Sequence, residues 1–124
     1  PFIQSKIISK AYQKLKDKRA NYCFSVTSFE FPIQRAIKIS NKDCVEMFYP
    51  KFFNTRSQDL EEAYHDAGQF YWGKAGAFED ELPLFSEGSI PYILESFLVQ
   101  DIDTEEDWKR AEIMHQVLKI KNLI

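Results

Sequence analysis

Two carboxylates stand two residues apart near the end of the chain, at Asp101 and Asp103. In extended backbone, residues two apart point to the same side, so both carboxylates can converge on one hard cation. A helix that begins directly afterwards adds its positive dipole end, which favours a phosphate oxygen nearby. The alternative is that Asp103 only caps this helix while Asp101 lies in solvent. Motifs this short recur by chance, so the spacing alone leaves both interpretations open.

Two arginines have sequence surroundings that suit the binding of an anion. Arg56 follows the aromatic stretch Tyr49–Phe53 and precedes a polar loop, so its planar guanidinium could bind a carboxylate or a phosphate. Arg35, just after Pro32, allows the same interpretation. The alternative for both is an ordinary solvated surface arginine.

The histidines and cysteines are weaker evidence for a functional site than the carboxylates and arginines. His65 lies between Tyr64 and Asp66 and could carry a proton, although adjacency in sequence is weak evidence for contact. His115 falls on the apolar side of the last predicted helix, where a core or interface role is favoured. The sequence has no serine elbow, phosphate-binding glycine loop or metalloprotease pattern, and its two cysteines lack the spacing of zinc ligands.

Helical periodicity predicts a helix at each end of the chain. The first runs from Ser5, as N-cap, to about Lys18, with apolar residues on one side and lysines on the other. The second begins at Asp103, which together with Glu106 matches a capping box, and continues to about Lys119. Its predicted apolar face consists of Trp108, Ala111, Met114, His115 and Leu118.

The residues between these helices favour strands. We expect a strand at 22–29, a hairpin made of 36–39 and 44–49, an aromatic strand at 68–73, and short strands at 90–94 and 97–99. Strands interleaved with terminal helices predict an α/β fold, with the hairpin as an antiparallel addition. Because an isolated hairpin is only marginally stable, we expect it to pack on something else, most naturally a second subunit.

Composition limits the classes of function. A chain of 124 residues fits one domain, and a net charge of −3 gives no bulk electrostatic reason to bind nucleic acid or an anionic membrane. There is no apolar run of transmembrane length and no signal segment, so we expect a cytoplasmic protein. The sequence starts at Pro1 without methionine and enters a helical pattern at once, which suggests a cut from a longer protein.

Several segments together resemble the late motifs of acylneuraminate cytidylyltransferases. Their order and spacing match as well, and the resemblance covers essentially the whole chain. Ser25–Ser28 followed by 31–36 is similar to the segment that enters that family's dimerisation arm, and Pro1–Gln4 is similar to the end of a mid-chain motif. The late motifs themselves are resembled by Arg56–Leu60, Tyr64–Tyr71 and Asp101–Trp108.

The resemblance implies a fold, a reaction and a set of site residues. The chain would be the C-terminal portion of a Rossmann-like nucleotidyltransferase domain, a single unit with a β-hairpin dimerisation arm at about residues 32–52. The family joins CTP to a nine-carbon 2-keto sugar acid and releases pyrophosphate, so the expected partners are CTP, a nonulosonic acid and a second copy of the chain. Asp101 and Asp103 would bind Mg²⁺, and Arg56 would hold the sugar carboxylate. The implied substrate-binding residues are Arg56, Gln58, Tyr64, His65 and Gln69, with Arg35 or Gln34 reaching a neighbouring subunit's substrate.

Two departures from the family pattern matter. Sialic-acid-activating members carry a second arginine and an Asn-Gly pair where this chain has His65 and Ala67-Gly68, so the sequence looks more like pseudaminic acid cytidylyltransferases. The family's N-terminal nucleotide-binding half, with its Pro-Ala-Arg loop, has no counterpart here. We therefore expect an inactive fragment of an enzyme. The alternative is a non-catalytic dimerisation or sugar-acid-binding module derived from that family.

Overall fold

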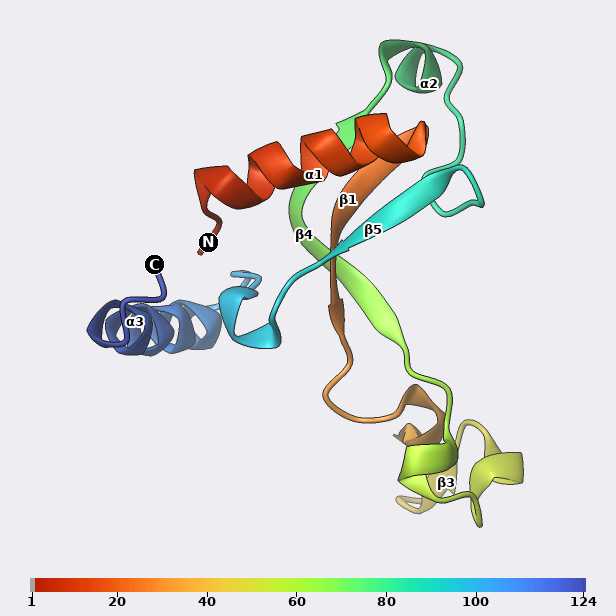
Figure 1. Cartoon of the computed structure of the whole chain (residues 1–124). Coiled ribbons are helices and arrows are strands. Elements are labelled where there is room, and N and C mark those ends of the chain that lie inside the picture. Colours follow the sequence, from red (N-terminus) through yellow and green to blue (C-terminus); the bar gives the residue numbers. More distant parts are fainter. Residues whose placement is uncertain (1) are drawn as a thin grey trace. The chain divides into compact units, whose positions relative to one another are not determined.

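The computed structural model describes residues 2–124. Pro1, the first residue of the segment Pro1–Gln4 that resembles a mid-chain family motif, lies outside them. Contacts divide the chain into two compact units. The first consists of the residues up to Thr27 together with Asp66–Ile124, and the second is Ser28–His65. The chain contains both α-helices and β-strands, and two of the strands pair in parallel, so the predicted α/β class is confirmed (Figure 1). None of the helices in residues 2–124 is long and apolar enough to cross a membrane.

A three-stranded sheet organises the first unit. Its central strand, β1 (Tyr22–Ser28), lies between β4 (Tyr64–Gly73) and β5 (Ser89–Ile93) (Figure 1). β1 and β5 run parallel, with Tyr22 opposite Ser89. Every residue from 22 to 27 is buried, as expected for a strand that has neighbours on both edges.

Helix α1 (Ser5–Lys18) covers one face of this sheet. Its Ala11 and Leu15 are buried against Cys23 of β1. Partly buried aromatic and aliphatic residues of the two outer strands complete this cluster. The helix has the predicted bounds, but its N-cap is Gln4 and not Ser5, and no side chain caps its start. Burial of one apolar face therefore stabilises this helix more than its end does.

The polar side chains of the central strand hydrogen-bond to the strands beside it. The Ser25 hydroxyl accepts the backbone N–H groups of Gln69 (3.1 Å) and Phe70 (3.2 Å) of β4. Just before them, Gly68 has φ +63°, a conformation that glycine adopts at little cost. Thr27 donates its hydroxyl proton to the carbonyl oxygen of Leu94 (3.0 Å). Ser25 thus supplies the acceptor at the point where β4 departs from regular strand geometry.

Helix α3 (Glu105–Ile120) follows a short connection from β5. Its Ala111 and Leu118 are buried in a cluster with Phe2, against which Leu98 and Met114 pack. The predicted apolar face is therefore correct for these residues, while Trp108 remains 56% exposed. The predicted strand at 97–99 is wrong, because Ser96–Leu98 forms a turn of 3-10 helix.

The remaining elements are short. In the first unit, α2 (Ala75–Glu79) lies between β4 and β5 along the chain. In the second unit, β2 (Ile37–Ile39) and β3 (Val45–Met47) pair antiparallel, which confirms the predicted hairpin. The Ser40 N–H donates to the carbonyl oxygen of Cys44 (2.8 Å) across its turn.

We predict that Ser25→Ala destabilises the chain by about 1–3 kcal/mol, because two backbone N–H groups of β4 lose their acceptor inside the protein. The measurement is the urea midpoint of unfolding. Ser9→Ala is the matched control, since Ser9 lies on the exposed side of α1 and bonds only to the carbonyl oxygen of Ser5. Equal midpoints for the two variants would contradict this role of Ser25.

Candidate functional site

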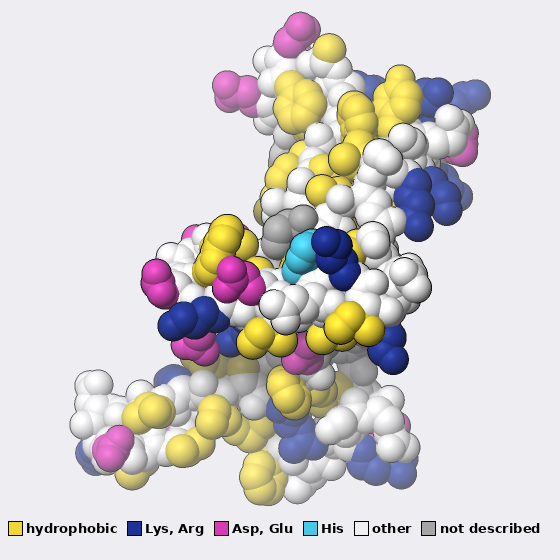
Figure 2. Space-filling model, turned by 90° about the vertical axis from the view of Figure 1, so that its left-hand side faces the viewer, with side chains coloured by type: hydrophobic (Ala, Val, Ile, Leu, Met, Phe, Trp, Pro, Cys, Tyr) yellow, Lys and Arg dark blue, Asp and Glu magenta, His cyan; other side chains and the backbone are white. Residues whose placement is uncertain are grey.

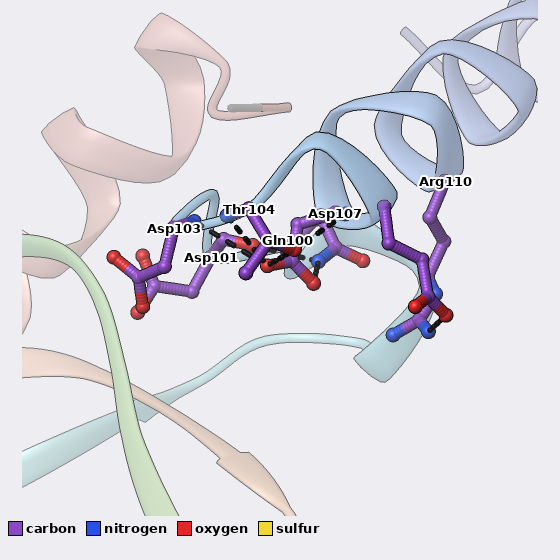
Figure 3. A network of polar contacts seen from close by, with 7 residues as sticks. Gln100, Asp101, Asp103, Thr104, Asp107 and Arg110 are labelled. Carbon is purple, nitrogen blue, oxygen red and sulfur yellow. Dashed lines mark hydrogen bonds and ion pairs between the residues drawn. The ribbon is translucent and has the colours of Figure 1, made fainter.

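The paired carboxylates lie on the connection that precedes α3. Asp101 and Asp103 are both exposed, and Figure 3 shows their side chains pointing to the same side, away from the helix. One oxygen of Asp101 accepts the backbone N–H of Ile102 (3.1 Å). No salt bridge among residues 2–124 includes either carboxylate. Both side chains are therefore open to a cation from solvent.

The cap of α3 differs from the predicted one by a single residue. Thr104 is the N-cap, and its hydroxyl accepts the N–H of Asp107 (3.2 Å), while Asp107 accepts the N–H of Thr104 (3.0 Å). The predicted capping box of Asp103 and Glu106 is wrong, because the overlapping Thr-x-x-Asp pattern forms instead. Asp103 therefore does not cap the helix with its carboxylate. The hydrogen bond from the Thr104 hydroxyl lowers the pKa of Asp107.

The donor set of this connection suits Mg²⁺. No group of three or more His, Cys, Asp or Glu side chains within residues 2–124 could hold a metal by itself. Asp101 and Asp103 would therefore supply two ligands, and the remaining ligands would come from water or substrate. Mg²⁺ commonly binds through one or two carboxylates while it keeps several waters and contacts substrate phosphates. Exposed carboxylate oxygens on one side of a loop fit this pattern, because hard oxygen ligands suit Mg²⁺.

Gln69 joins the sheet of the first unit to the segment that leads to the carboxylates. Its side-chain Nε2 donates to the carbonyl oxygen of Leu98 (2.8 Å), in the turn that precedes Gln100 and Asp101. Its Oε1 is buried and has no hydrogen-bond partner within the part of the chain that the structure describes. The Gln69 side chain therefore anchors the segment that leads to Asp101, while its carbonyl oxygen accepts no hydrogen bond within the described residues.

Two of the predicted site residues of the second unit hydrogen-bond to backbone carbonyls there. Gln34 is 8% exposed, and its Nε2 donates to the carbonyl oxygen of Glu61 (3.0 Å). Arg35 donates from Nη2 to the carbonyl oxygen of Thr55. Both side chains thus hold the ends of the polar loop that contains Arg56.

The other predicted site residues of this unit lie in or just after that loop. Arg56 donates from Nε to Asp59 (2.9 Å) in an exposed ion pair, and Gln58 is exposed between them. A hydrogen bond with Glu62 raises the pKa of Tyr64. The ring of His65 lies edge-on to Phe29, at 4.8 Å between centroids. The structure brings Arg56 and Gln58 together in one turn, whereas Tyr64 and His65 begin β4.

An apolar cavity of about 240 Å³ lies beside α3, and sequence reasoning missed it. One of its lining residues, Ile102, stands between Asp101 and Asp103 in the sequence. Figure 2 shows apolar side chains exposed among charged ones on one face of the molecule. The apolar spacing of the helix was the only signal that could have located the cavity. Its lining consists of Phe2, Ile102, Trp108, Ala111, Glu112 and His115.

Comparisons with known proteins identify relatives of this chain. No protein-family model matches it. Two pseudaminic acid cytidylyltransferases from Campylobacter jejuni strains are each 40% identical over 117 residues, which is 94% of this chain and 50% of the relative. The chain is a homologue of pseudaminic acid cytidylyltransferases. The predicted resemblance to pseudaminic acid cytidylyltransferases is therefore confirmed, and the mixed α/β fold agrees with it.

The match covers only part of each relative, so homology alone does not assign the relatives' complete activity to this chain. The chain spans about half the length of the Campylobacter pseudaminic acid cytidylyltransferases. A Helicobacter pylori protein named both as a pseudaminic acid cytidylyltransferase and as a UDP-2,4-diacetamido-2,4,6-trideoxy-beta-L-altropyranose hydrolase is 39% identical over 101 residues. This match covers 81% of the chain but 19% of that relative. The relatives thus share one region with this chain, and each extends well beyond it.

An ionisable pair lies within the family motif on β4. The Tyr71 hydroxyl donates to Oδ2 of Asp66, and this hydrogen bond to a carboxylate raises the pKa of Tyr71 to about 12. The ring of Tyr71 also stacks on Phe24 of the central strand, with 5.8 Å between centroids. The Asp66 side chain accepts the N–H of Gly68 as well, at the point where β4 departs from regular geometry.

We predict that the Tyr71 ring titrates near pH 12, and that Asp66→Asn moves its pKa toward about 10, the ordinary value for tyrosine. Since the folded-state pKa is raised, the stabilisation is complete below pH 10 and is lost as pH rises through 12. NMR of the Tyr71 ring against pH provides the measurement. Asp80→Asn, remote in sequence, is the control. An unchanged Tyr71 pKa in Asp66→Asn would show that the carboxylate is not the cause.

Proposed function

We propose that the full-length parent protein transfers CMP from CTP to pseudaminic acid, a nonulosonic sugar acid, and releases pyrophosphate in the cytoplasm. The observation that carries this proposal is 40% identity to pseudaminic acid cytidylyltransferases over 94% of the chain. This region contributes the metal and sugar-acid residues. Because it spans about half of those relatives, we propose that it does not turn over CTP alone.

Asp101 and Asp103 are the proposed Mg²⁺ ligands. When bound, the metal supplies charge neutralisation at the reacting phosphate and orients the attacking hydroxyl. The two exposed carboxylates support this role, because neither caps α3 and neither has a cationic partner within residues 2–124. The N-terminus of α3, immediately after the pair, favours the approach of an anionic substrate group.

Arg56 is proposed to bind the sugar carboxylate. Its present ion pair with Asp59 is exposed, with 74% of the Arg56 side chain accessible, and exposed pairs of this kind contribute little stability. Exchange of Asp59 for a substrate carboxylate therefore costs little. Gln58, Tyr64 and His65 are proposed to contact the same substrate. Gln69, in the first unit, is also a proposed substrate-binding residue, and its Oε1 has no hydrogen-bond partner within the part of the chain that the structure describes.

The hairpin is proposed to form a homodimer contact. Ile37 faces Met47 and Ile39 faces Val45 across the strands, so all four lie on one side, while Lys38 and Glu46 pair on the other (3.4 Å). The apolar side is exposed, at 73% for Ile39 and 68% for Val45. Such a hairpin needs a surface to cover it, and a second copy is the occupant we propose. Gln34 or Arg35, just before the first strand of the hairpin, would then reach the neighbouring subunit's substrate.

A second candidate function is a non-catalytic module that dimerises or binds a sugar acid. It is favoured by the half-length match, because the region shared with the relatives includes the hairpin and the carboxylate loop. The two candidates differ in whether the parent protein releases pyrophosphate.

The parent protein is expected to release pyrophosphate from CTP with pseudaminic acid and Mg²⁺. Asp101→Asn and Asp103→Asn should each remove most of this turnover, because a neutral amide is a poorer ligand for a hard dication. Pyrophosphate release with pseudaminic and sialic acids is the assay, and Glu112→Gln, farther along α3, is the control. Faster turnover with sialic acid than with pseudaminic acid would contradict the proposed substrate. If neither sugar led to release of pyrophosphate, the non-catalytic module would be favoured.

Arg56→Lys in the parent protein should raise the KM for the sugar acid about tenfold or more, because an ammonium group keeps the charge but cannot reproduce a two-pronged contact. The KM for CTP should change little. Lys51→Arg is the matched control on the same unit. An equal loss for both substrates would indicate a folding defect and not a carboxylate contact.

Charged substitutions on the apolar side of the hairpin, Ile37→Glu with Val45→Glu, should produce monomers in both this chain and the parent protein. Light scattering at several concentrations gives the oligomeric state. Lys38→Gln with Glu46→Gln is the control, because it changes only the polar side of the same strands. A wild-type chain that is monomeric at high concentration would refute the proposed contact.

A further inference from the structure

The Asp107 carboxylate binds groups outside its own helix. Its Oδ2 accepts the Thr104 hydroxyl (2.7 Å) and the backbone N–H groups of Thr104 (3.0 Å) and Asp103 (3.4 Å). A capping box requires only the contacts with Thr104. The additional bond fixes the amide of Asp103, which is the backbone of one proposed metal ligand.

The other oxygen of Asp107 reaches the second ligand through Gln100. The Gln100 Nε2 donates to Oδ1 of Asp107 (3.4 Å) and to the carbonyl oxygen of Asp101 (2.7 Å). Asp101 and Asp103 are thus held by their backbones at both ends of a three-residue loop, and one carboxylate connects the two attachments. Figure 3 shows this network, with Gln100, Thr104 and Asp107 on the helix side and the carboxylates of Asp101 and Asp103 pointing away from them.

We propose that Asp107 and Gln100 are positioning residues that set the separation of the Asp101 and Asp103 carboxylates. This inference rests on the proposed metal role of the pair. Neither positioning residue binds the metal. Holding a short, exposed loop in one conformation lowers the conformational entropy lost when a cation binds, and residues that orient metal ligands typically change metal affinity ten- to a hundredfold.

The alternative is that Asp107 only caps α3 and complements the helix dipole. Glu106→Gln separates these effects, because Glu106 lies beside Asp107 in the first turn and pairs with Arg110 (3.3 Å), not with the loop. Asp107→Asn removes the same charge and keeps an oxygen that can accept the Thr104 N–H. Gln100→Ala is uncharged and lies outside the helix, so it breaks the bonds to Asp101 and to Oδ1 of Asp107 but leaves the Oδ2 contacts of the cap in place.

The experiment is a titration of this 124-residue chain with Mn²⁺, a paramagnetic stand-in for Mg²⁺, followed by broadening of backbone amide NMR signals. In the wild-type chain, broadening should centre on residues 101–104, and Asp101→Asn or Asp103→Asn should abolish it. Asp107→Asn and Gln100→Ala should each raise the Mn²⁺ Kd about tenfold, while Glu106→Gln leaves it within about twofold. Circular dichroism should show helix content in Gln100→Ala equal to that of the wild-type chain.

The outcomes separate the two claims. If Asp101→Asn abolishes binding while Asp107→Asn and Gln100→Ala bind like Glu106→Gln, the positioning role is wrong and the metal pair stands. If Asp107→Asn weakens binding only together with a loss of helix, and Gln100→Ala binds normally, Asp107 is a helix cap and the proposal is overturned. If the wild-type chain shows no broadening at residues 101–104, the metal pair and this inference both fail.

Discussion

Burial of the central strand is the constraint on which the first unit depends. Because β1 has a strand on each edge and is buried from residue 22 to residue 27, its polar side chains must find partners inside the protein. Ser25 does so by accepting two amides of β4, one of them from Gln69. Gln69 in turn holds Leu98, which leads into the loop of Asp101. A hydrogen-bonded path thus connects the buried strand with the exposed carboxylate pair.

The elements that the sequence predicted correctly are those with a strong period or a strong turn signal. The helix at 5–18 and the strand at 22–28 follow directly from apolar patterning, and the hairpin follows from its polar turn. The error at 97–99 has a physical cause: a short apolar run does not distinguish a strand from a 3-10 turn. The contacts of Ser25 with β4 join residues far apart in the chain, so no local pattern could reveal them.

The candidate site was predictable to the extent that its residues share one short segment. The Asp101 and Asp103 pair is visible in the spacing, whereas the assignment of the cap required atomic detail, because Asp103–Glu106 and Thr104–Asp107 both fit the same pattern. That difference of one residue changes the chemistry, since a capping Asp103 would turn its carboxylate toward the helix amides. The bonds of Gln34 and Arg35 to loop carbonyls were invisible for a different reason: their partners lie 27 and 20 residues away.

The start of α3 carries a high density of negative charge, and this charge bears on the role of Asp101 and Asp103. Five carboxylates occur between residues 101 and 107, and their mutual repulsion opposes folding unless each is compensated. Those on the helix are compensated: Glu105 and Glu106 pair with basic residues one turn later, and Asp107 accepts several N–H and O–H groups. Asp101 and Asp103 have no cationic partner within residues 2–124. Solvent ions screen these two carboxylates, and the dication proposed for the pair would relieve their repulsion most directly.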